Sequence, residues 1–148
     1  MQVRIATEED VPFIVSAARD IHSEFSNDIK FEEEKTLDTV YSFLGTDLTE
    51  KMLVVSYTDK VYTGVIAGML SVTPFSSERV ALEPLFWTNK NPKSFLLLHK
   101  VFITWAEKVE ADYCLVSTPT NTKLDKLDKL YSKLGYSKFE YTFIKRIK

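Results

Sequence analysis

The segment Tyr131-Ser-Lys-Leu-Gly-Tyr136 is the most informative stretch of this chain. Leucines recur at helical spacing from Leu124 to Leu134, and Gly135 is a typical residue just past a helix end. Tyr131 would lie one turn before that end, where its phenol can lean across the mouth of a sheet with a proton to donate. The segment therefore predicts a helix that ends at a glycine and leads into a strand, with a tyrosine at the junction.

The periodic patterns outside this segment predict a mixed α/β domain. By residue range we expect a strand over 3–6, helices over 7–25 and 31–44, strands over 52–57, 61–73 and 79–87, a helix over 92–109, a strand over 112–117, a helix over 124–134, and strands over 136–139 and 141–147. The predicted order is β-α-α-β-β-β-α-β-α-β-β, in a single domain that spans residues 1–148.

Pro84 interrupts the strand predicted over 79–87. Proline donates no hydrogen bond to a sheet ladder, so its presence indicates a sheet edge, a bulge or a place where neighbouring strands part. A polar segment, Thr88 to Ser94, follows. In it, Asn91 is a suitable helix cap and Pro92 suits a first helical turn.

The composition excludes several classes of function. The 148 residues are 45% hydrophobic and 27% charged, and the net charge of −2 gives no basic surface for nucleic acid. We expect no signal peptide, because no apolar stretch follows a basic start, and no apolar run approaches the roughly 18 residues of a membrane helix. A single cysteine, Cys114, and two histidines are too few for a cysteine-rich or histidine-rich metal site. We expect a cytoplasmic protein that binds no nucleic acid, membrane or metal.

The element order, together with the stretch Leu130 to Tyr136, resembles the GNAT superfamily of acyl-CoA-dependent N-acyltransferases. The opening Val3 to Asp10 and a hairpin that holds Gly64 and Gly68 are similar to that family as well. A narrower likeness is to small phage-type members of the family. It rests on the stretches His22-Ser-Glu-Phe25, Glu83-Pro-Leu-Phe-Trp87 and Glu140-Tyr-Thr-Phe-Ile-Lys-Arg-Ile147.

The resemblance implies a fold and an activity. The fold is a GNAT-like mixed sheet whose fourth and fifth strands splay apart, and a C2 homodimer through the C-terminal strands is a habit of the family. The activity is direct transfer of an acetyl group from acetyl-CoA to an amine of a small molecule or a protein, without a metal. Tyr131 matches the tyrosine that lies near the CoA sulfur as general acid. Glu83 is the candidate general base, directly or through water.

The resemblance also assigns residues to acetyl-CoA. The pantetheine arm would lie along the strand at Leu85, Phe86 and Trp87, and Asn121 resembles an asparagine that contacts the arm or orients the site. The pyrophosphate would lie at residues 88–94, where a helix dipole favours anions.

The segment 88–94 departs from the family because it contains no glycine. Lys90, Lys93 and the Ser94 hydroxyl are the candidates to contact phosphate through side chains instead. The alternative is weak CoA binding or none, in a catalytically impaired binding protein or a virion- or complex-associated protein with the same fold.

The acceptor amine is not identified by the sequence. His22, Glu24 and Phe25 fall where the first predicted helix turns toward the acceptor cleft, so they are candidates for substrate recognition. For His22, an exposed or capping role is the other interpretation. His99 and Cys114 are expected in the core. The acidic residues Glu24 and 32–34 would suit a cationic amine, although acidic runs are also typical of helix starts.

Overall fold

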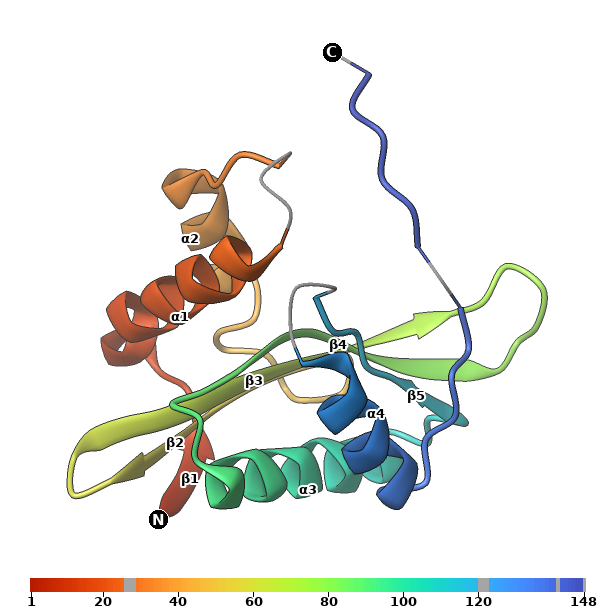
Figure 1. The fold of residues 1–148 in the computed structure, drawn as a ribbon. Helices are drawn as coiled ribbons and strands as arrows, with labels where there is room; N and C mark the ends of the chain where they lie inside the picture. Colours follow the sequence, from red (N-terminus) through yellow and green to blue (C-terminus); the bar gives the residue numbers. More distant parts are fainter. Residues whose placement is uncertain (26–28, 120–122, 141, 148) are drawn as a thin grey trace.

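The structure is a computed structural model that describes residues 1–25, 29–119, 123–140 and 142–147. In these ranges, five strands form one sheet in the order β1-β2-β3-β4-β5 (Figure 1). The strands are β1 (Gln2–Ile5), β2 (Lys51–Thr58), β3 (Val61–Val72), β4 (Arg79–Thr88) and β5 (Tyr113–Leu115). Only the β4–β5 pair is parallel, so the sheet is mixed and the predicted mixed α/β class is confirmed.

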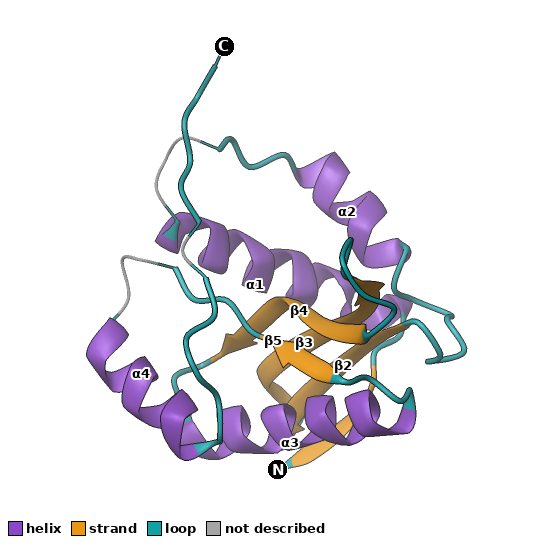
Figure 2. Ribbon diagram, turned by 90° about the vertical axis from the view of Figure 1, so that its right-hand side faces the viewer, coloured by secondary structure: helices purple, strands orange, loops and turns teal. Residues whose placement is uncertain are grey.

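Four helices cover the two faces of the sheet in the described ranges. They are α1 (Val11–Glu24), α2 (Glu33–Tyr41), α3 (Pro92–Lys108) and α4 (Leu124–Lys133), and a short 3-10 turn (Glu8–Asp10) precedes α1. Helices α1 and α2 lie on one side of the sheet, and α3 and α4 lie on the other (Figures 1 and 2).

Alternating side chains of the central strands pack into two separate cores. Val55 and Val65 belong to the core under α1 and α2, whereas Val54 and Ile66 belong to the core under α3. Because successive residues of a strand point to opposite faces, both faces must be apolar when helices cover both. This double burial explains why the central strands read as continuous apolar runs.

The start of α3 lies directly on β3. A Cβ atom added at Gly64 would come within 2.7 Å of Leu98 Cδ1 and 2.9 Å of Ser94 Oγ, so only glycine permits this approach. Below it, the Ser94 hydroxyl donates to the Thr63 carbonyl oxygen at 3.0 Å and lies 2.9 Å from the Ser56 hydroxyl. These buried hydrogen bonds fix the beginning of α3 against β2 and β3.

At Pro84, β4 has a bulge on the side of β3 and separates from β5 on the other side. On the β3 side, Leu85 pairs with Ala67 and Leu82 with Met69, so two residues of β4 stand opposite Gly68. On the other side, the last β4–β5 pair is Leu82 with Leu115, while β4 continues to Thr88. Since proline has no N–H, both ladders are interrupted at this point. The expected splay of the fourth and fifth strands is therefore present.

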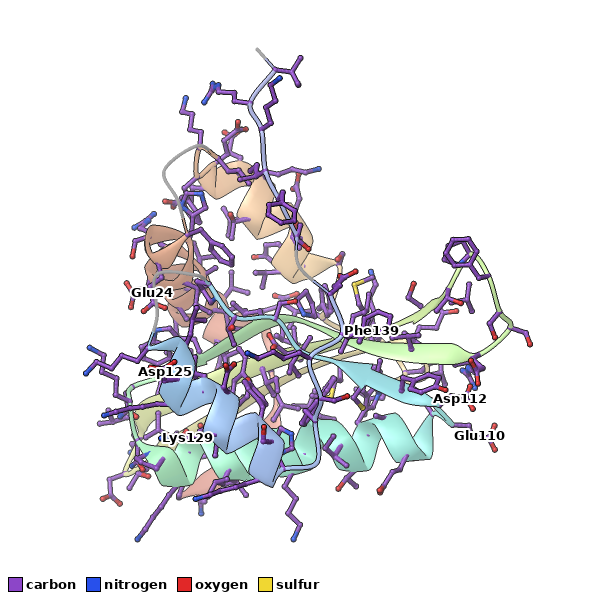
Figure 3. All side chains as sticks on the ribbon, turned by 45° about the vertical axis from the view of Figure 1, so that its right-hand side comes forward. Glu24, Glu110, Asp112, Asp125, Lys129 and Phe139 are labelled. Atoms are coloured by element: carbon purple, nitrogen blue, oxygen red, sulfur yellow. The ribbon has the colours of Figure 1, made fainter. Side chains whose placement is uncertain are left out.

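The C-terminal prediction was wrong. Residues 136–140 and 142–147 form no strand, although strands were predicted over 136–139 and 141–147. The strand predicted over 112–117 is shortened to Tyr113–Leu115, which leaves a short edge for further strands to pair with. The side chains of Phe139 and Phe143 are 77% and 92% exposed, and the segment runs away from the sheet (Figures 1 and 3). Its alternating apolar pattern is present without a partner strand to cover it.

No helix in the described part of the chain has the length and apolar character needed to cross a membrane. Within the same ranges, no three His, Cys, Asp or Glu side chains gather as a group that could hold a metal ion.

Candidate active site

A cavity of about 580 Å³ opens where β4 and β5 part. It is lined by Asp20, Ile21, Ser23 and Glu24 of α1, by Glu83, Phe86, Trp87 and Thr88 of β4, by Asn89 and Lys90, by Phe95 of α3, by Ser117, Thr118 and Pro119 after β5, and by Leu127 and Tyr131 of α4. Helices α1 and α4 lie on opposite sides of the sheet (Figure 1). The cavity therefore passes through the layer of the sheet, in the opening that the splay leaves.

Glu83 lines this cavity from the bulged part of β4. Burial raises the pKa of its carboxyl well above the usual range, and a hydrogen bond from the Ser117 backbone opposes the shift only in part. A carboxyl of this kind titrates closer to neutral pH than an exposed glutamate does. It is therefore suited to accept a proton and to release it again within one reaction.

Tyr131 faces the same cavity from the last turn of α4. Burial raises the pKa of its phenol, and the nearby carboxyl of Glu83 and the phenol of Tyr136 raise it further. The hydroxyl therefore keeps its proton throughout the ordinary pH range. It can act as a hydrogen-bond donor to a negative charge that develops in the cavity.

The end of α4 holds Tyr131 by a Schellman motif, as the glycine in the sequence predicts. The Tyr136 N–H donates to the Tyr131 carbonyl oxygen at 2.9 Å, and the Gly135 N–H donates to the Ser132 carbonyl oxygen at 3.1 Å. Gly135 has a φ of +88°, a backbone conformation that favours glycine. Phe95 of α3 packs edge-on against the Tyr131 ring, with a centroid distance of 6.0 Å.

The segment before α3 turns without glycine because Lys90 adopts a left-handed conformation, with a φ of +65°. Lys90 lines the main cavity and also an adjoining cavity of about 220 Å³. The second cavity lies between the start of α3 and α4, among Thr88, Asn91, Pro92, Phe95, Leu96 and Leu130. The two cavities share Thr88, Lys90 and Phe95, so they adjoin each other. The positively charged side chain of Lys90 lies where they meet.

The first turn of α3 offers few free amide groups to an anion. Pro92 has no N–H, and the Lys93 N–H donates to the Asn91 side-chain oxygen at 3.0 Å. The Ser94 side chain is 0% exposed and its hydroxyl is engaged with Thr63 and Ser56, so the expected contact between this hydroxyl and phosphate is corrected. Lys90 and Lys93 are the charged side chains that remain for a phosphate at this place.

Two carboxylates form the opposite end of the cavity. Asp20 and Glu24 lie one turn apart near the C-terminal end of α1 and both line the cavity (Figure 3 labels Glu24). Acidic groups at this end of a helix oppose the helix dipole, so the helix itself does not account for them. The cavity is therefore acidic at the α1 end and basic at the α3 end.

The structure brings some of the predicted residues together and separates others. Glu24, Glu83, Phe86, Trp87, Lys90 and Tyr131 all line the main cavity. Leu85 instead packs against the core under α1 and α2, and Lys93 is exposed on the first turn of α3. Asn121 lies outside the described residues.

The two other residues predicted at the acceptor end do not line the cavity. The His22 ring packs edge-on against Phe31 at 5.4 Å, and its Nε2 atom is buried without a hydrogen-bond partner among the described residues. Phe25 is exposed at the end of α1. Sequence analysis missed Asp20, whose spacing of four residues from Glu24 was the available signal.

No family model matches the sequence, and no curated protein matches it. Solved structures do match over nearly the whole chain. The aminoglycoside 6′-N-acetyltransferase of Acinetobacter haemolyticus has 12% identity and a TM-score of 0.71, with 100% of both chains covered. The ribosomal-protein-alanine N-acetyltransferase of Brucella melitensis biovar Abortus has 10% identity and a TM-score of 0.69, with 99% of this chain and 100% of the other covered.

A predicted acetyltransferase of Clostridium acetobutylicum, solved with acetyl-CoA, has 12% identity and a TM-score of 0.75. The match covers 98% of this chain and 95% of the other. The narrower likeness to phage-type members finds no support in these comparisons. At these identities the comparisons establish the fold, which is the fold of the GNAT-type acetyltransferases.

Proposed function

We propose that this protein is an N-acetyltransferase that transfers the acetyl group of acetyl-CoA directly to an amine. The observation that carries the proposal is the cavity that crosses the sheet at the splay, with Glu83 and Tyr131 in its wall. Its lining comes from helices on both sides of the sheet, α1 on one side and α3 and α4 on the other, so two substrates approaching from opposite sides could meet in it. The solved structures with this fold include one with acetyl-CoA and one with CoA, which supports acetyl-CoA as the co-substrate.

Acetyl-CoA would enter from the α3–α4 side. On the side of β5, no strand among the described residues pairs with β4 beyond Leu82, so the backbone groups at 85–87 that face this side can pair with the amides of a pantetheine arm. The adjoining cavity between α3 and α4 continues this path, and Lys90 lies where the pyrophosphate would pass. Lys93, exposed on the neighbouring turn, is the second cation available there.

The reaction requires one bond to form and one to break. The amine nitrogen attacks the thioester carbonyl carbon, and Glu83 accepts the proton that the nitrogen loses, directly or through water. As the carbon–sulfur bond breaks, negative charge develops on the sulfur, and Tyr131 donates a hydrogen bond to it. The products are an N-acetylated amine and a free thiol.

The acidities of the CoA thiol and the Tyr131 phenol indicate where the proton of the thiol product comes from. An ordinary thiol has a pKa of about 8.5, well below that of a phenol whose pKa burial has raised. Complete transfer of the Tyr131 proton to the thiolate is therefore unfavourable. We assign Tyr131 to stabilisation of the leaving sulfur, and the proton that Glu83 has accepted passes to the sulfur through water.

The acidic end of the cavity favours a cationic acceptor. Asp20 and Glu24 flank the α1 opening and can hold the additional positive charges of an amine that carries more than one. Among the structures with this fold, one protein acts on aminoglycosides and another on a ribosomal-protein alanine, so amine acceptors of very different size are compatible with it. His22 and Phe25 have no part in this acceptor assignment.

Titration calorimetry with acetyl-CoA tests the proposal before any acceptor is known. We expect saturable binding that raises the unfolding temperature as the ligand concentration rises. Lys90→Gln should weaken binding about 3- to 10-fold through loss of a charged contact with phosphate. Lys100→Gln, an exposed lysine further along α3, is the matched control and should leave binding unchanged. Absence of binding at millimolar acetyl-CoA would remove the proposed activity and leave a binding protein with this fold.

A further inference from the structure

A partly buried hydrogen bond joins α3 to the chain just after α4. His99 lies on α3 and is only 7% exposed, and its Nε2 atom lies 3.0 Å from the Tyr136 hydroxyl oxygen. The two rings also meet edge to face, with a centroid distance of 5.6 Å. Burial lowers the pKa of His99, which favours the neutral ring, and a neutral ring can accept a hydrogen bond from the Tyr136 hydroxyl. Nothing in the proposed chemistry uses this pair directly.

The Schellman motif connects the same pair to Tyr131. The motif places Tyr136 over Tyr131, because the amide of the one bonds to the carbonyl of the other. Their rings are in edge contact, with a centroid distance of 5.4 Å and an interplanar angle of 76°. The chain of contacts therefore runs from His99 through Tyr136 to the phenol in the cavity.

Apart from these rings and the contact of Tyr131 with Phe95, helix α4 packs lightly on the rest of the described chain. None of its ten residues, Leu124 to Lys133, is buried. Its ion pair between Asp128 and Lys138, at 2.7 Å, lies on the surface, where such pairs contribute little to stability. The rings around His99 are thus the anchor through which the well-buried α3 can hold the end of α4.

We propose that His99 and Tyr136 are positioning residues that hold Tyr131 at the splay between β4 and β5. This inference rests on the proposed function, because it assigns a task to Tyr131. It adds two residues that do not line the cavity, and it gives a reason for a polar pair in a partly buried cluster of aromatic rings. Burying a hydroxyl and an imidazole has a cost unless they bond to each other, and their bond fixes one orientation of the α4 end.

The experiment compares Tyr136→Phe and His99→Phe with the wild-type protein, with spermidine as the acceptor probe. We expect each variant to lower kcat about 10- to 100-fold, because small displacements of a reacting group have effects of this size. The KM for acetyl-CoA should change less than about twofold, since neither residue lines the cavities. His99→Gln, whose side-chain amide oxygen can accept the same hydrogen bond from the Tyr136 hydroxyl, should restore most of kcat.

Two further measurements separate positioning from general stability. In a Tyr131→Phe background, Tyr136→Phe and His99→Phe should lower kcat no further, because the group they position is gone. Tyr62→Phe is the matched control, since Tyr62 also donates a phenolic hydrogen bond, to Asp10, but lies outside both cavities. It should leave kcat unchanged even if it lowers stability.

Hydrogen exchange of residues 124–136 gives an answer that does not depend on activity. Exchange should become faster in Tyr136→Phe and His99→Phe but not in Tyr62→Phe. Wild-type kcat in both variants, or an equal loss of kcat in the Tyr131→Phe background, would overturn the proposal. If the wild-type protein does not acetylate spermidine, the positioning role is tested by hydrogen exchange alone, and unchanged protection of α4 in both variants overturns it. The proposed function is then tested separately, by acetyl-CoA binding.

Discussion

Glu83 occupies a place where an ionised carboxyl lowers stability and supports the proposed chemistry. It is half-buried at the bulge, and its pKa is raised because burial disfavours the charged form. A carboxyl whose folded-state pKa is raised destabilises the fold when it is ionised, and this penalty disappears as pH falls through the folded-state pKa. At Glu83, the group that the proposed reaction needs therefore lowers the stability of the folded protein.

Glu83→Gln should accordingly stabilise the protein while it removes activity. We expect the free energy of unfolding to rise by about 1 kcal/mol at pH 8, and the gain to shrink as pH falls toward the raised pKa. Denaturant unfolding at several pH values measures this difference. Gln in place of Glu107, a surface residue of α3, is the control and should show no such pH dependence. A destabilised Glu83→Gln variant at pH 8 would contradict the assigned burial cost.

Single residues could be predicted where their chemistry depends on local sequence. Tyr131 was found from the glycine that ends its helix, and Pro84 indicated the interrupted strand beside Glu83. Ser94 could not be predicted correctly, because its burial depends on Gly64, thirty residues earlier, which lets α3 settle onto β3. Nothing in the local pattern shows whether a hydroxyl at a helix start faces solvent or a neighbouring strand.

Among the elements, the start of α1 is tied to the sheet by a buried carboxylate. Asp10 is 0% exposed and accepts hydrogen bonds from Arg4 at 2.6 and 2.8 Å, from the Tyr62 hydroxyl at 2.6 Å and from the Thr7 N–H at 2.7 Å. Burial alone would raise the pKa of Asp10, but the hydrogen bonds outweigh it and lower the pKa to about 2. The network joins β1, the 3-10 turn and β3.

Asp10→Asn should lower the free energy of unfolding by about 2 kcal/mol at pH 7. Because the folded-state pKa is depressed, the stabilisation is present above about pH 4, the usual pKa of an aspartate, and is lost as pH falls toward 2. Wild-type and variant stabilities should therefore converge between these values in denaturant titrations. A difference that stays constant down to pH 2 would show that the charge of Asp10 is not the source of the stabilisation.

The C-terminal turns of α1 should control affinity for a charged acceptor. In Asp20→Asn/Glu24→Gln, we expect the KM for spermidine to rise about 3- to 10-fold, with kcat little changed, because exposed charges contribute modestly to binding. The KM for a monoamine should change less. Glu9→Gln, in the 3-10 turn that precedes α1 and outside the cavity, is the matched control. Equal effects on monoamines and polyamines would exclude the assigned electrostatic role.

The predicted C-terminal strands show why periodicity does not suffice to define a strand. Apolar residues alternate through the segment after Tyr136, but a strand forms only where an edge is available for pairing. In the structure the edge strand β5 is three residues long, and the side chains of Phe139 and Phe143 are exposed. The homodimer through these segments stays a prediction, which the molecular mass in solution would test.

At the scale of the whole molecule, the order and type of the elements up to α4 agree with the sequence prediction, because each depends on local periodicity and end signals. The cavity could not be predicted in the same way. Asp20, Phe95 and Ser117 meet there only because α1 and α3 cover opposite faces of the sheet and β5 ends early. The site results from how the helices pack on the two faces of the sheet, and the periodicity of the sequence does not predict that packing.

The most direct test of the central claim follows both products of one reaction. The protein is mixed with acetyl-CoA and a panel of mono- and polyamines, and free thiol and acetylated amine are measured together by absorbance and mass spectrometry. We predict equal amounts of thiol and N-acetylated amine, with rates about 10- to 100-fold lower in Tyr131→Phe and Glu83→Gln. Acetyl-CoA binding without either product, or rates in both variants equal to the wild-type rate, would contradict the account.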